Sequence, residues 1–374
     1  MREIEYWIWI SSLEGMGAVK AMGLLKMYKN PRIVYEMSEH ELKQTKLLTD
    51  KNIQEILDKQ KRERVNKIYE LMIKHNIKMI NVFDDNYPYN LKQIYDPPIA
   101  LYYKGKFELN DFAIAIVGSR RTTNYGSYSA KKLAYDLSLR GVPIVSGLAR
   151  GIDSIAHEGC LAAGGKTIAV LGCGLDTIYP PENTKLCEDI IKSDGLVISE
   201  YPPGMPPLQH NFPARNRIIS GISSGVLVVE AAKRSGSLIT ACYALEQGRE
   251  VFAIPGNIDC AYSRGTNQLI KDGAKMVLCA EDVLEEFDYI EASDNSEAQN
   301  DLSKRGSKTN FSIFRGLSTE EIRIAKIISN GIHDIDEIID RSNNPTKEVN
   351  NILFMLEMKG VITQLPGKIF NMCL

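Results

Sequence analysis

Two segments in the middle of the chain contain the residue types that bind phosphate. In the first, Gly118, Ser119 and Arg120 follow the apolar run 113–117 and precede a helical pattern. Glycine allows a tight backbone turn, and the free amides at a helix start attract anions. The guanidinium of Arg120 adds a forked, permanently charged donor, so we prefer a phosphate contact to a surface ion pair at this position.

The second segment, residues 210–217, reads HNFPARNR and places two arginines, Arg215 and Arg217, beside an aromatic ring. Arginines suit phosphates, and an aromatic ring suits stacking against a nucleic-acid base. Phe212 precedes a proline, and an anchor in the hydrophobic core is an equally good interpretation of it. The segment therefore predicts a nucleic-acid contact in which the role of Phe212 is open.

Further glycine-containing loops follow other apolar runs. Residues 146–151 read SGLARG and lack the Gly-x-Gly-x-x-Gly order of a dinucleotide site. Residues 235–237 read SGS before a helical segment, a pattern typical of an anion-binding turn. Residues 178–186 form a proline-stiffened turn that offers an amide and a lysine. The candidates from these loops are Gly147, Arg150, Gly151, Asn183, Lys185, Ser235, Gly236, Ser237 and Thr240.

A catalytic set is much harder to find in this sequence. Asp153 and His157 lie four residues apart, as in a metal or acid–base pair, but we favour a local Asp–His hydrogen bond or charge pairing at a helix start. The sequence has no Walker loop and no His/Cys metal cluster. We therefore predict a surface for a chain of phosphates, with no catalytic residue, metal or cofactor.

Composition indicates an ordinary soluble protein. The 374 residues are 44% hydrophobic and 25% charged, and no apolar run is long enough to cross a bilayer. The seven cysteines are scattered without a Cys-x-x-Cys pair, which fits a reducing cytoplasm. The net charge of −2 means that a polyanion must be met by positive charge focused at one site.

The elements that position these loops alternate between strand and helix. The apolar runs 113–117, 142–145, 167–171, 196–199, 226–230, 251–254 and 276–278 are separated by helical patterns. This order predicts a doubly wound, mostly parallel Rossmann-like sheet, whose ligands lie beyond the carboxyl ends of the strands. We assign residues 79–290 to this α/β domain.

Residues 1–78 are predicted to form a helical domain, since apolar residues recur every three or four positions. The turn Gly15-Met16-Gly17 between two short helices resembles a helix-hairpin-helix or SAM-like domain, but a plain helical turn is the simpler interpretation. We assign no DNA contact to it.

Residues 291–312 have almost no apolar content and are predicted to be a flexible linker. Residues 313–374 show a capping box at Ser318, three helical patterns and a hairpin across Pro366-Gly367, as in a winged helix. The recognition helix at 346–359 carries two lysines and two glutamates, which disfavours a duplex-reading regulator and makes a protein contact at least as good an interpretation.

Six long stretches of residues 84–278 resemble the DNA-processing protein A family, also called DprA or Smf. Among them are VGSRRTTNYG, VSGLARGIDSIAHEGCLAAGGKTIAVLGCGLDTIYPPENTKL, HNFPARNRIISGIS and VVEAAKRSGSLITACYALEQGREVFAIPGN. The resemblance implies a single-stranded DNA binding protein that protects incoming strands in natural transformation (competence) and helps load a RecA-type recombinase. It also implies a homodimer that uses the later half of the sheet domain.

The same resemblance assigns roles to individual positions. Arg120 becomes the strand-end phosphate contact, and Lys185 is the basic residue of its turn. The backbone and bases of the DNA are contacted by the loop that contains Phe212, Arg215, Asn216 and Arg217. Ser235, Gly236, Ser237 and Thr240 close the phosphate track.

A competing function is enzymatic. The glycine-loop sheet also resembles the phosphoribohydrolases that release free bases from nucleoside monophosphates, whose Pro-Gly-Gly-x-Gly-Thr-x-x-Glu stretch carries a catalytic glutamate. The matching segment here reads KRSGSLITACYALE, with Cys242 and Tyr243 after Thr240 and no glutamate before Glu246. Release of free base from AMP distinguishes the two functions.

Overall fold

A computed structural model gives the fold of the chain. It describes residues 1–109 and 112–287 and, towards the C-terminus, 321, 323–324, 327–328, 334–342, 344, 346–358, 362–365 and 369–372. The chain divides into two compact units, Met1–Ser296 and Glu297–Leu374. The linker predicted over 291–312 and the capping box predicted at Ser318 lie outside the described residues.

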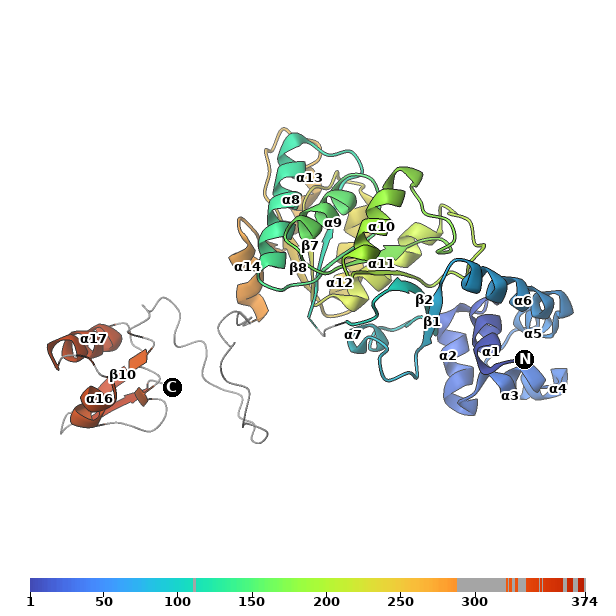
Figure 1. Cartoon of the computed structure of the whole chain (residues 1–374), viewed down its shortest axis with the longest axis horizontal. Helices are drawn as coiled ribbons and strands as arrows, with labels where there is room; N and C mark the ends of the chain where they lie inside the picture. The colour runs from blue at the N-terminus through green and yellow to red at the C-terminus, as the bar shows by residue number, and fades with distance from the viewer. Residues whose placement is uncertain are drawn as a thin grey trace. The chain divides into compact units, whose positions relative to one another are not determined.

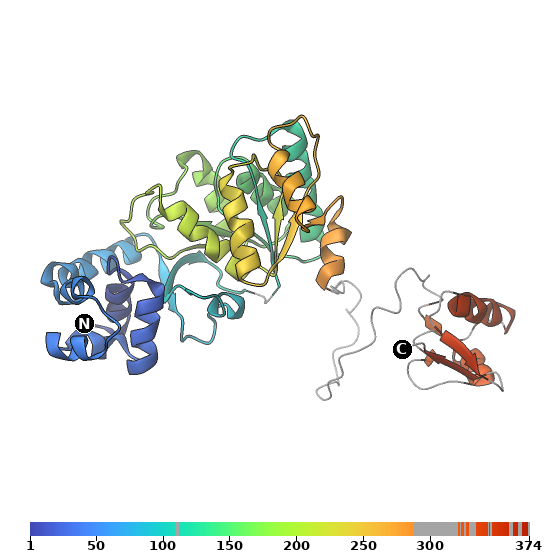
Figure 2. The same ribbon diagram turned by 180° about the vertical axis from the view of Figure 1, so that it is seen from behind.

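The first 74 residues are helical, as predicted. Two of the starts are fixed by capping boxes, Ser38 with Glu41 and Thr49 with Asn52, which satisfy amides that lack helical partners. The helices are α1 (Glu3–Ser11), α2 (Gly17–Tyr28), α3 (Pro31–Glu36), α4 (Glu39–Gln44), α5 (Asp50–Leu57) and α6 (Lys59–Lys74). They lie beside β1 and β2 in both views (Figures 1 and 2).

The strands between residues 78 and 276 form one nine-stranded sheet with the order β1-β2-β6-β5-β4-β3-β7-β8-β9. From β6 to β9 all neighbours are parallel, which confirms the predicted doubly wound sheet. The bounds are β1 (Lys78–Asn81), β2 (Ala100–Gly105), β3 (Ile114–Val117), β4 (Ile144–Ser146), β5 (Thr167–Leu171), β6 (Leu196–Ser199), β7 (Gly225–Val228), β8 (Glu250–Ala253) and β9 (Lys275–Met276).

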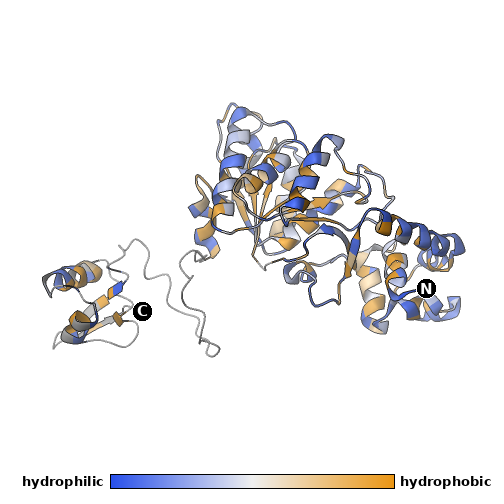
Figure 3. Cartoon of the chain, in the orientation of Figure 1, coloured by the Kyte–Doolittle hydropathy of each residue, from blue (hydrophilic) through white to orange (hydrophobic). Residues whose placement is uncertain are grey.

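Helices cover both faces of this sheet, because successive strand residues point to opposite sides. Ile114 and Ile116 pack with α8 (Asn124–Leu139) and α9 (Ile152–Ala162), while Ala115 and Val117 belong to the core on the opposite face. Figure 1 shows α8 and α9 in front of the strands. Figure 2 shows the molecule from behind, where α11 (Asn211–Ile222) and α12 (Gly236–Glu246) cover the opposite face of the sheet. The strands are the most apolar layer (Figure 3). The remaining helices of this unit are α7 (Tyr89–Lys92), α10 (Thr184–Lys192), α13 (Arg264–Lys271) and α14 (Ala280–Leu284), with 3-10 turns at Pro181–Asn183 and Glu285–Phe287.

The N-terminal helices and the sheet share one hydrophobic core. It contains Trp7 and Trp9 of α1 together with Leu101 of β2 and Val197 of β6. The hydroxyl oxygens of Ser11 and Tyr102 also lie 2.9 Å apart. The division of this unit into domains at residues 1–78 and 79–290 stays a prediction. β1 and β2 add two antiparallel strands at one end of the sheet, so α1 rests on a continuation of it.

The strand order reverses at β3. The chain moves from β3 to β4, β5 and β6 in one direction, and then returns to the other side of β3 to form β7, β8 and β9. At such a switch point the loops after neighbouring strands diverge and leave a crevice beyond their carboxyl ends. The loops after β3 and β7 therefore define the expected ligand site.

The second unit contains the elements expected of a winged helix over 313–374. Its described helices α16 (Ile335–Ser342) and α17 (Thr346–Met358) are followed by the antiparallel pair β10 (Ile362–Leu365) and β11 (Ile369–Met372). α17 coincides with the predicted recognition helix. The unit has its own core, formed by Ile324, Ile328, Ile338, Val349, Leu353, Leu356, Ile362 and Phe370. No helix in the described residues is long and apolar enough to span a membrane.

Candidate nucleic-acid interface

The crevice at the switch point is a cavity of about 600 Å³. The loop after β3, the first turns of α11 and the start of α12 form its walls. We call it the phosphate cradle, and define it by the predicted site residues that line it: Gly118, Ser119, Arg120, Phe212, Arg215, Asn216, Ser235, Gly236, Ser237 and Thr240. Tyr179 and Gln209 also line it and are absent from the predicted set: Tyr179 lies in the turn 178–186, of which only the amide and the lysine are candidates, and Gln209 directly precedes the segment 210–217.

The backbone around Ser119 is fixed by the start of α9. The Ile152 amide donates to the Ser119 carbonyl at 3.1 Å, and the Arg121 amide donates to the Ser119 hydroxyl at 3.1 Å. Gly151 has a φ of 79°, and a Cβ atom there would lie 2.3 Å from the Ser119 carbonyl oxygen. Gly151 thus permits the close approach of two loops, and is not itself part of the cradle lining.

The side chain of Arg120 extends from this fixed backbone and is exposed. Among the described residues, no carboxylate lies within ion-pair distance of it. Its guanidinium carbon lies 5.6 Å from the ring centroid of Phe212, within the range of a cation–π contact. A surface ion pair, the alternative to a phosphate contact, is therefore not what holds this side chain.

Phe212 is half-buried at the start of α11. Its ring centroid lies 5.5 Å from that of Tyr179, and a Cβ atom on Gly172 would come within 3.0 Å of the ring. Part of the ring is thus packed against protein, and Arg120 lies over it. The interpretation as a core anchor therefore describes part of this side chain, and stacking against a base stays a prediction.

The start of α12 forms the opposite wall of the cradle. Ser235 is the N-cap, and its hydroxyl accepts from the Ser237 amide at 3.4 Å. Space is open beside Gly236, where an added Cβ atom would have no neighbour within 4 Å. The first amides of a helix have no intrahelical acceptors and carry partial positive charge. This wall can therefore accept an anion.

Arg215 belongs to the floor of the cradle, with only 3% of its surface exposed. Its Nη1 atom donates to the carbonyl of Gly147 at 2.8 Å and to the carbonyl of Val170. The Gly147 amide in turn donates to Asp153 at 3.1 Å. Burial raises the pKa of the Asp153 carboxyl, and the nearby Arg215 guanidinium opposes that shift. The direct phosphate contacts predicted for Arg215 and Gly147 do not fit these buried, internally bonded positions.

Arg217 does not reach the cradle. Two residues along a helix turn the side chain by about 200°, so Arg217 projects from the face of α11 opposite Arg215. Its Nε lies 2.9 Å from Asp96 Oδ2 and its Nη2 lies 2.7 Å from Glu200 Oε1, with 6% of the residue exposed. This buried, internally paired side chain does not support the predicted DNA contact of Arg217. The residue ties α11 to the segments around 96 and 200.

Three further predicted contacts lie towards β4 and β5, outside the cradle lining. Arg150 forms an ion pair with Glu182, and Asn183 donates to the Leu148 carbonyl at 2.8 Å. Lys185 is exposed, and no described carboxylate lies within ion-pair distance of it. Of the three, only Lys185 has a side chain without such an internal partner.

Asp153 lies in the first turn of α9, as charge pairing at a helix start predicts, whereas the alternative, an Asp–His hydrogen bond, is not among the bonds of the described side chains: His157 bonds to Thr167 instead. The imidazole Nδ1 lies 2.7 Å from the Thr167 hydroxyl, and burial lowers the pKa of His157 to about 3. The ring is therefore neutral at physiological pH. Among the residues that the structure describes, no three His, Cys, Asp or Glu side chains gather as a metal site would require.

The backbone groups of the N-terminal hairpin turn, around Gly15-Met16-Gly17, form hydrogen bonds within the protein. The Glu14 amide donates to Glu55 Oε1 at 2.8 Å, and Asn52 donates to the Gly15 carbonyl at 2.9 Å. The turn lines a separate cavity of about 820 Å³ together with Arg217. Carboxylates at this turn disfavour phosphate binding.

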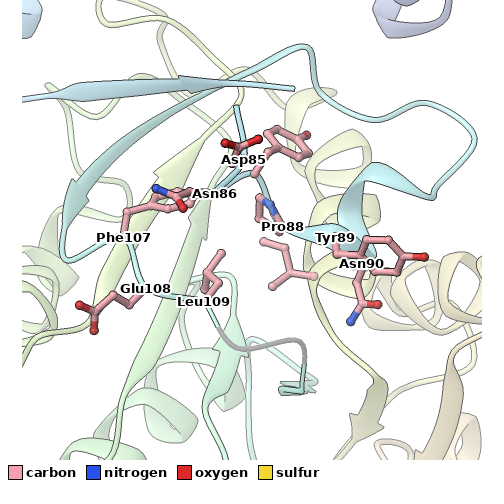
Figure 4. A pocket seen from close by; sticks show the side chains of 10 residues that line it. Asp85, Asn86, Pro88, Tyr89, Asn90, Phe107, Glu108 and Leu109 are labelled. Atoms are coloured by element: carbon pink, nitrogen blue, oxygen red, sulfur yellow. The ribbon is translucent and has the colours of Figure 1, made fainter. Parts of the chain in front are cut away.

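Another cavity, of about 650 Å³, lies between α7 and the end of β2 (Figure 4). The carboxylates of Asp85 and Glu108 are in its lining, and no lysine or arginine is found among its described lining residues. Lys106 and Lys166 outside the lining pair with Glu108, so the described lining offers a chain of phosphates no cation of its own. Of these cavities, the cradle is the one that suits a polyanion.

Comparison with known proteins finds two family models that match the chain. Residues 78–288 match the family model of DNA recombination-mediator protein A, and residues 315–368 match the DprA winged helix domain. The DNA processing protein DprA of Streptococcus pneumoniae is 52% identical over 210 residues, which cover 56% of this chain and 74% of that protein.

Two solved structures are similar to the chain. The X-ray structure of DNA processing protein A from Streptococcus pneumoniae has a TM-score of 0.66 at 40% identity, covering 78% of this chain and all (100%) of that one. A structure of DNA processing protein A from Helicobacter pylori, which describes a single-stranded DNA binding mode, has a TM-score of 0.52 at 33% identity. It covers 57% of this chain and 97% of that one.

Proposed function

The chain belongs to the DNA recombination-mediator protein A family, and on that premise we propose that it binds single-stranded DNA at the carboxyl edge of its parallel strands. The observation that carries the proposal is Arg120, an exposed arginine without an ion pair to any described carboxylate. It lies beside a half-exposed aromatic ring and opposite a helix N-terminus in one crevice. The single-stranded DNA binding mode of the Helicobacter pylori relative supports the same assignment.

In this proposal the cradle holds the strand through two types of contact. Arg120 and the turn Ser235–Ser237 hold phosphates, and Phe212 stacks against a base. Phosphate contacts carry no sequence information, and every base offers a face for stacking. The protein therefore binds strands of any sequence. It excludes a duplex, because paired bases cannot reach the ring.

The biological role that we infer is to protect incoming single strands in natural transformation and recombination. The protein then passes the strand to a RecA-type recombinase in the cytoplasm. The winged helix contacts a protein partner, since the sequence of α17 contains Glu348 and Glu357 but a single lysine, Lys347.

We also propose a homodimer formed by the later half of the sheet. β9 is an edge strand, with Met276 47% exposed and the following Leu278 70% exposed. An edge strand with exposed apolar side chains is suited to pairing with a second copy.

The protein is proposed to act without catalysis. A glutamate that served a phosphoribohydrolase-like reaction would have to reach the cradle beside Thr240. Glu246 is instead exposed at the last residue of α12, about 15 Å along the helix from Gly236 at about 1.5 Å per residue. Incubation with AMP is expected to release no free adenine above the uncatalysed level.

The test is a gel shift of the whole chain with one labelled oligonucleotide, presented single-stranded or annealed to its complement. We expect a shift with the single strand and a much weaker one with the duplex. Equal or preferential binding of the duplex would reject the proposed function.

A further inference from the structure

Positive charge is distributed unevenly around the cradle. Towards β4 and β5, Arg150 is paired with Glu182, Asp176 lies in the loop after β5, and Lys185 is the exposed cation without a described carboxylate in ion-pair distance. Towards β7 and β8, four cations are exposed, and none lies within ion-pair distance of a described carboxylate: Arg121, Lys233, Arg234 and Arg264. The electrostatic attraction on a polyanion is therefore stronger on the β7 and β8 side.

Opposing charge on that side is small. Glu230 is 2% exposed, and its carboxylate accepts from the Thr123 amide at 3.1 Å. Asp259 is the exposed carboxylate of the loop after β8. A phosphate chain that crosses this side therefore meets more cations than anions.

Three loops lie side by side there and form one continuous edge. The Gly265 amide donates to the Ala231 carbonyl at 2.7 Å, and the Ala231 amide donates to the Tyr262 carbonyl at 2.7 Å. The Tyr125 hydroxyl of α8 donates to the Pro255 carbonyl at 2.9 Å. These contacts join the loops after β3, β7 and β8 beyond their strands.

Aromatic rings accompany the cations on this edge. Tyr125 and Tyr128 are 51% and 67% exposed, and their spacing of three residues places them on one face of α8. Single exposed aromatic side chains are ordinary. Two adjacent rings beside unpaired cations form the combination that sequence-tolerant binding of single strands uses, a basic path with stacking surfaces.

We propose that single-stranded DNA leaves the cradle over the loops after β7 and β8, along a path that we call the exit edge. It consists of Arg121, Tyr125, Tyr128, Lys233, Arg234 and Arg264. The inference rests on the proposed function, since it extends the same strand beyond the cradle. It turns the track away from Arg150, Asn183 and Lys185, where the sequence had placed it.

The test compares oligo-dT of about 5 nucleotides, enough for the cradle, with oligo-dT of about 20 nucleotides, which also reaches the exit edge. Arg234→Ala with Arg264→Ala removes two charges from the exit edge. Arg150→Ala with Lys185→Ala removes two charges from the opposite side as the matched control. To test the contribution of the aromatic rings, Tyr128→Ala is compared with the control Tyr135→Ala. Tyr135 is on the same helix, about two turns further from the edge.

We expect the exit-edge pair to weaken binding of the long oligonucleotide about tenfold and to lower its salt slope by about 1.4, at about 0.7 per phosphate contact. Binding of the short oligonucleotide should change less than about twofold. The control pair should leave both unchanged, and Tyr128→Ala should weaken only the long complex. An equal loss in the two double variants, or a loss confined to the control pair, would overturn the proposed path. Failure of the unchanged protein to bind either oligonucleotide would instead reject the proposed function.

Discussion

The guanidinium carbon of Arg120, in the loop after β3, lies 5.6 Å from the ring centroid of Phe212 at the start of α11, 92 positions further along the chain. The contact joins the cation and the aromatic ring that are proposed to bind DNA. The guanidinium covers part of the ring when no strand is bound. In the proposed function, a turn of Arg120 outward to a phosphate would uncover the ring face on which a base is proposed to stack, so that the two proposed contacts would form together.

Replacement of Arg120 by alanine is expected to weaken oligo-dT binding about tenfold. A charge-assisted hydrogen bond contributes about 1.5–3 kcal/mol, and its loss also removes a cation that displaces counterions. Filter binding at several salt concentrations should give a slope lower by about 0.7. Arg120→Lys keeps the charge and should retain the slope with a smaller loss of affinity. An unchanged affinity and slope in Arg120→Ala would remove this residue from the site.

Phe212→Ala is expected to cost about 1–3 kcal/mol of binding free energy through lost stacking. Some stability should also be lost, because the ring packs against Tyr179. Phe212→Tyr keeps the ring and serves as the control. A chemical-denaturation curve beside the binding titration separates the two effects. A variant that unfolds easily but binds normally when folded would identify Phe212 as a core residue.

Arg217→Met is expected to lower the free energy of unfolding without changing DNA affinity. Removing the guanidinium leaves Asp96 and Glu200 without their cation. Breaking a buried ion pair costs about 3–5 kcal/mol, and the partial exposure of the two carboxylates favours the lower end. Urea unfolding measures this loss. A large drop in oligo-dT affinity at unchanged stability would restore Arg217 as a DNA contact.

His157 is expected to make the protein less stable as the pH falls. Its pKa is about 3 in the folded protein, against an ordinary value of 6.5, so only the unfolded chain gains the proton between those values. The free energy of unfolding should therefore fall by up to about 1.4 kcal/mol per pH unit below about pH 6.5. In His157→Gln that contribution is absent, and urea titrations at several pH values should show a flatter dependence. Parallel curves for the two proteins would contradict a neutral, buried His157.

The strand pattern and the strand-end loops could be predicted because each is local. Apolar runs separated by helical patterns predict a parallel sheet, and the carboxyl ends of parallel strands meet at one edge. Arg120, Phe212 and the turn at Ser235 are brought together for that reason. The crevice between β3 and β7 follows from the strand order, which the runs alone do not reveal.

Side-chain direction was the part that loop position could not give. Arg215 and Arg217 are two residues apart in a helix, so they face opposite sides, and both are bonded within the protein. The positions of Gly147 and Gly151 in the sequence are typical of anion-binding loops. In the structure, Gly147 makes room for the Arg215 guanidinium, and Gly151 makes room for the loop after β3. In each case the partner comes from a distant part of the sequence.

The most direct test of the central claim is photo-crosslinking of the whole chain to an oligonucleotide that carries 5-bromodeoxyuridine, a base that couples to nearby aromatic side chains. The crosslinked peptides are then mapped by mass spectrometry. The proposed function predicts coupling within residues 209–217, which contain Phe212, and the loss of that coupling in Phe212→Leu. Coupling confined to α17 or to the N-terminal hairpin turn, with none at the cradle, would contradict it.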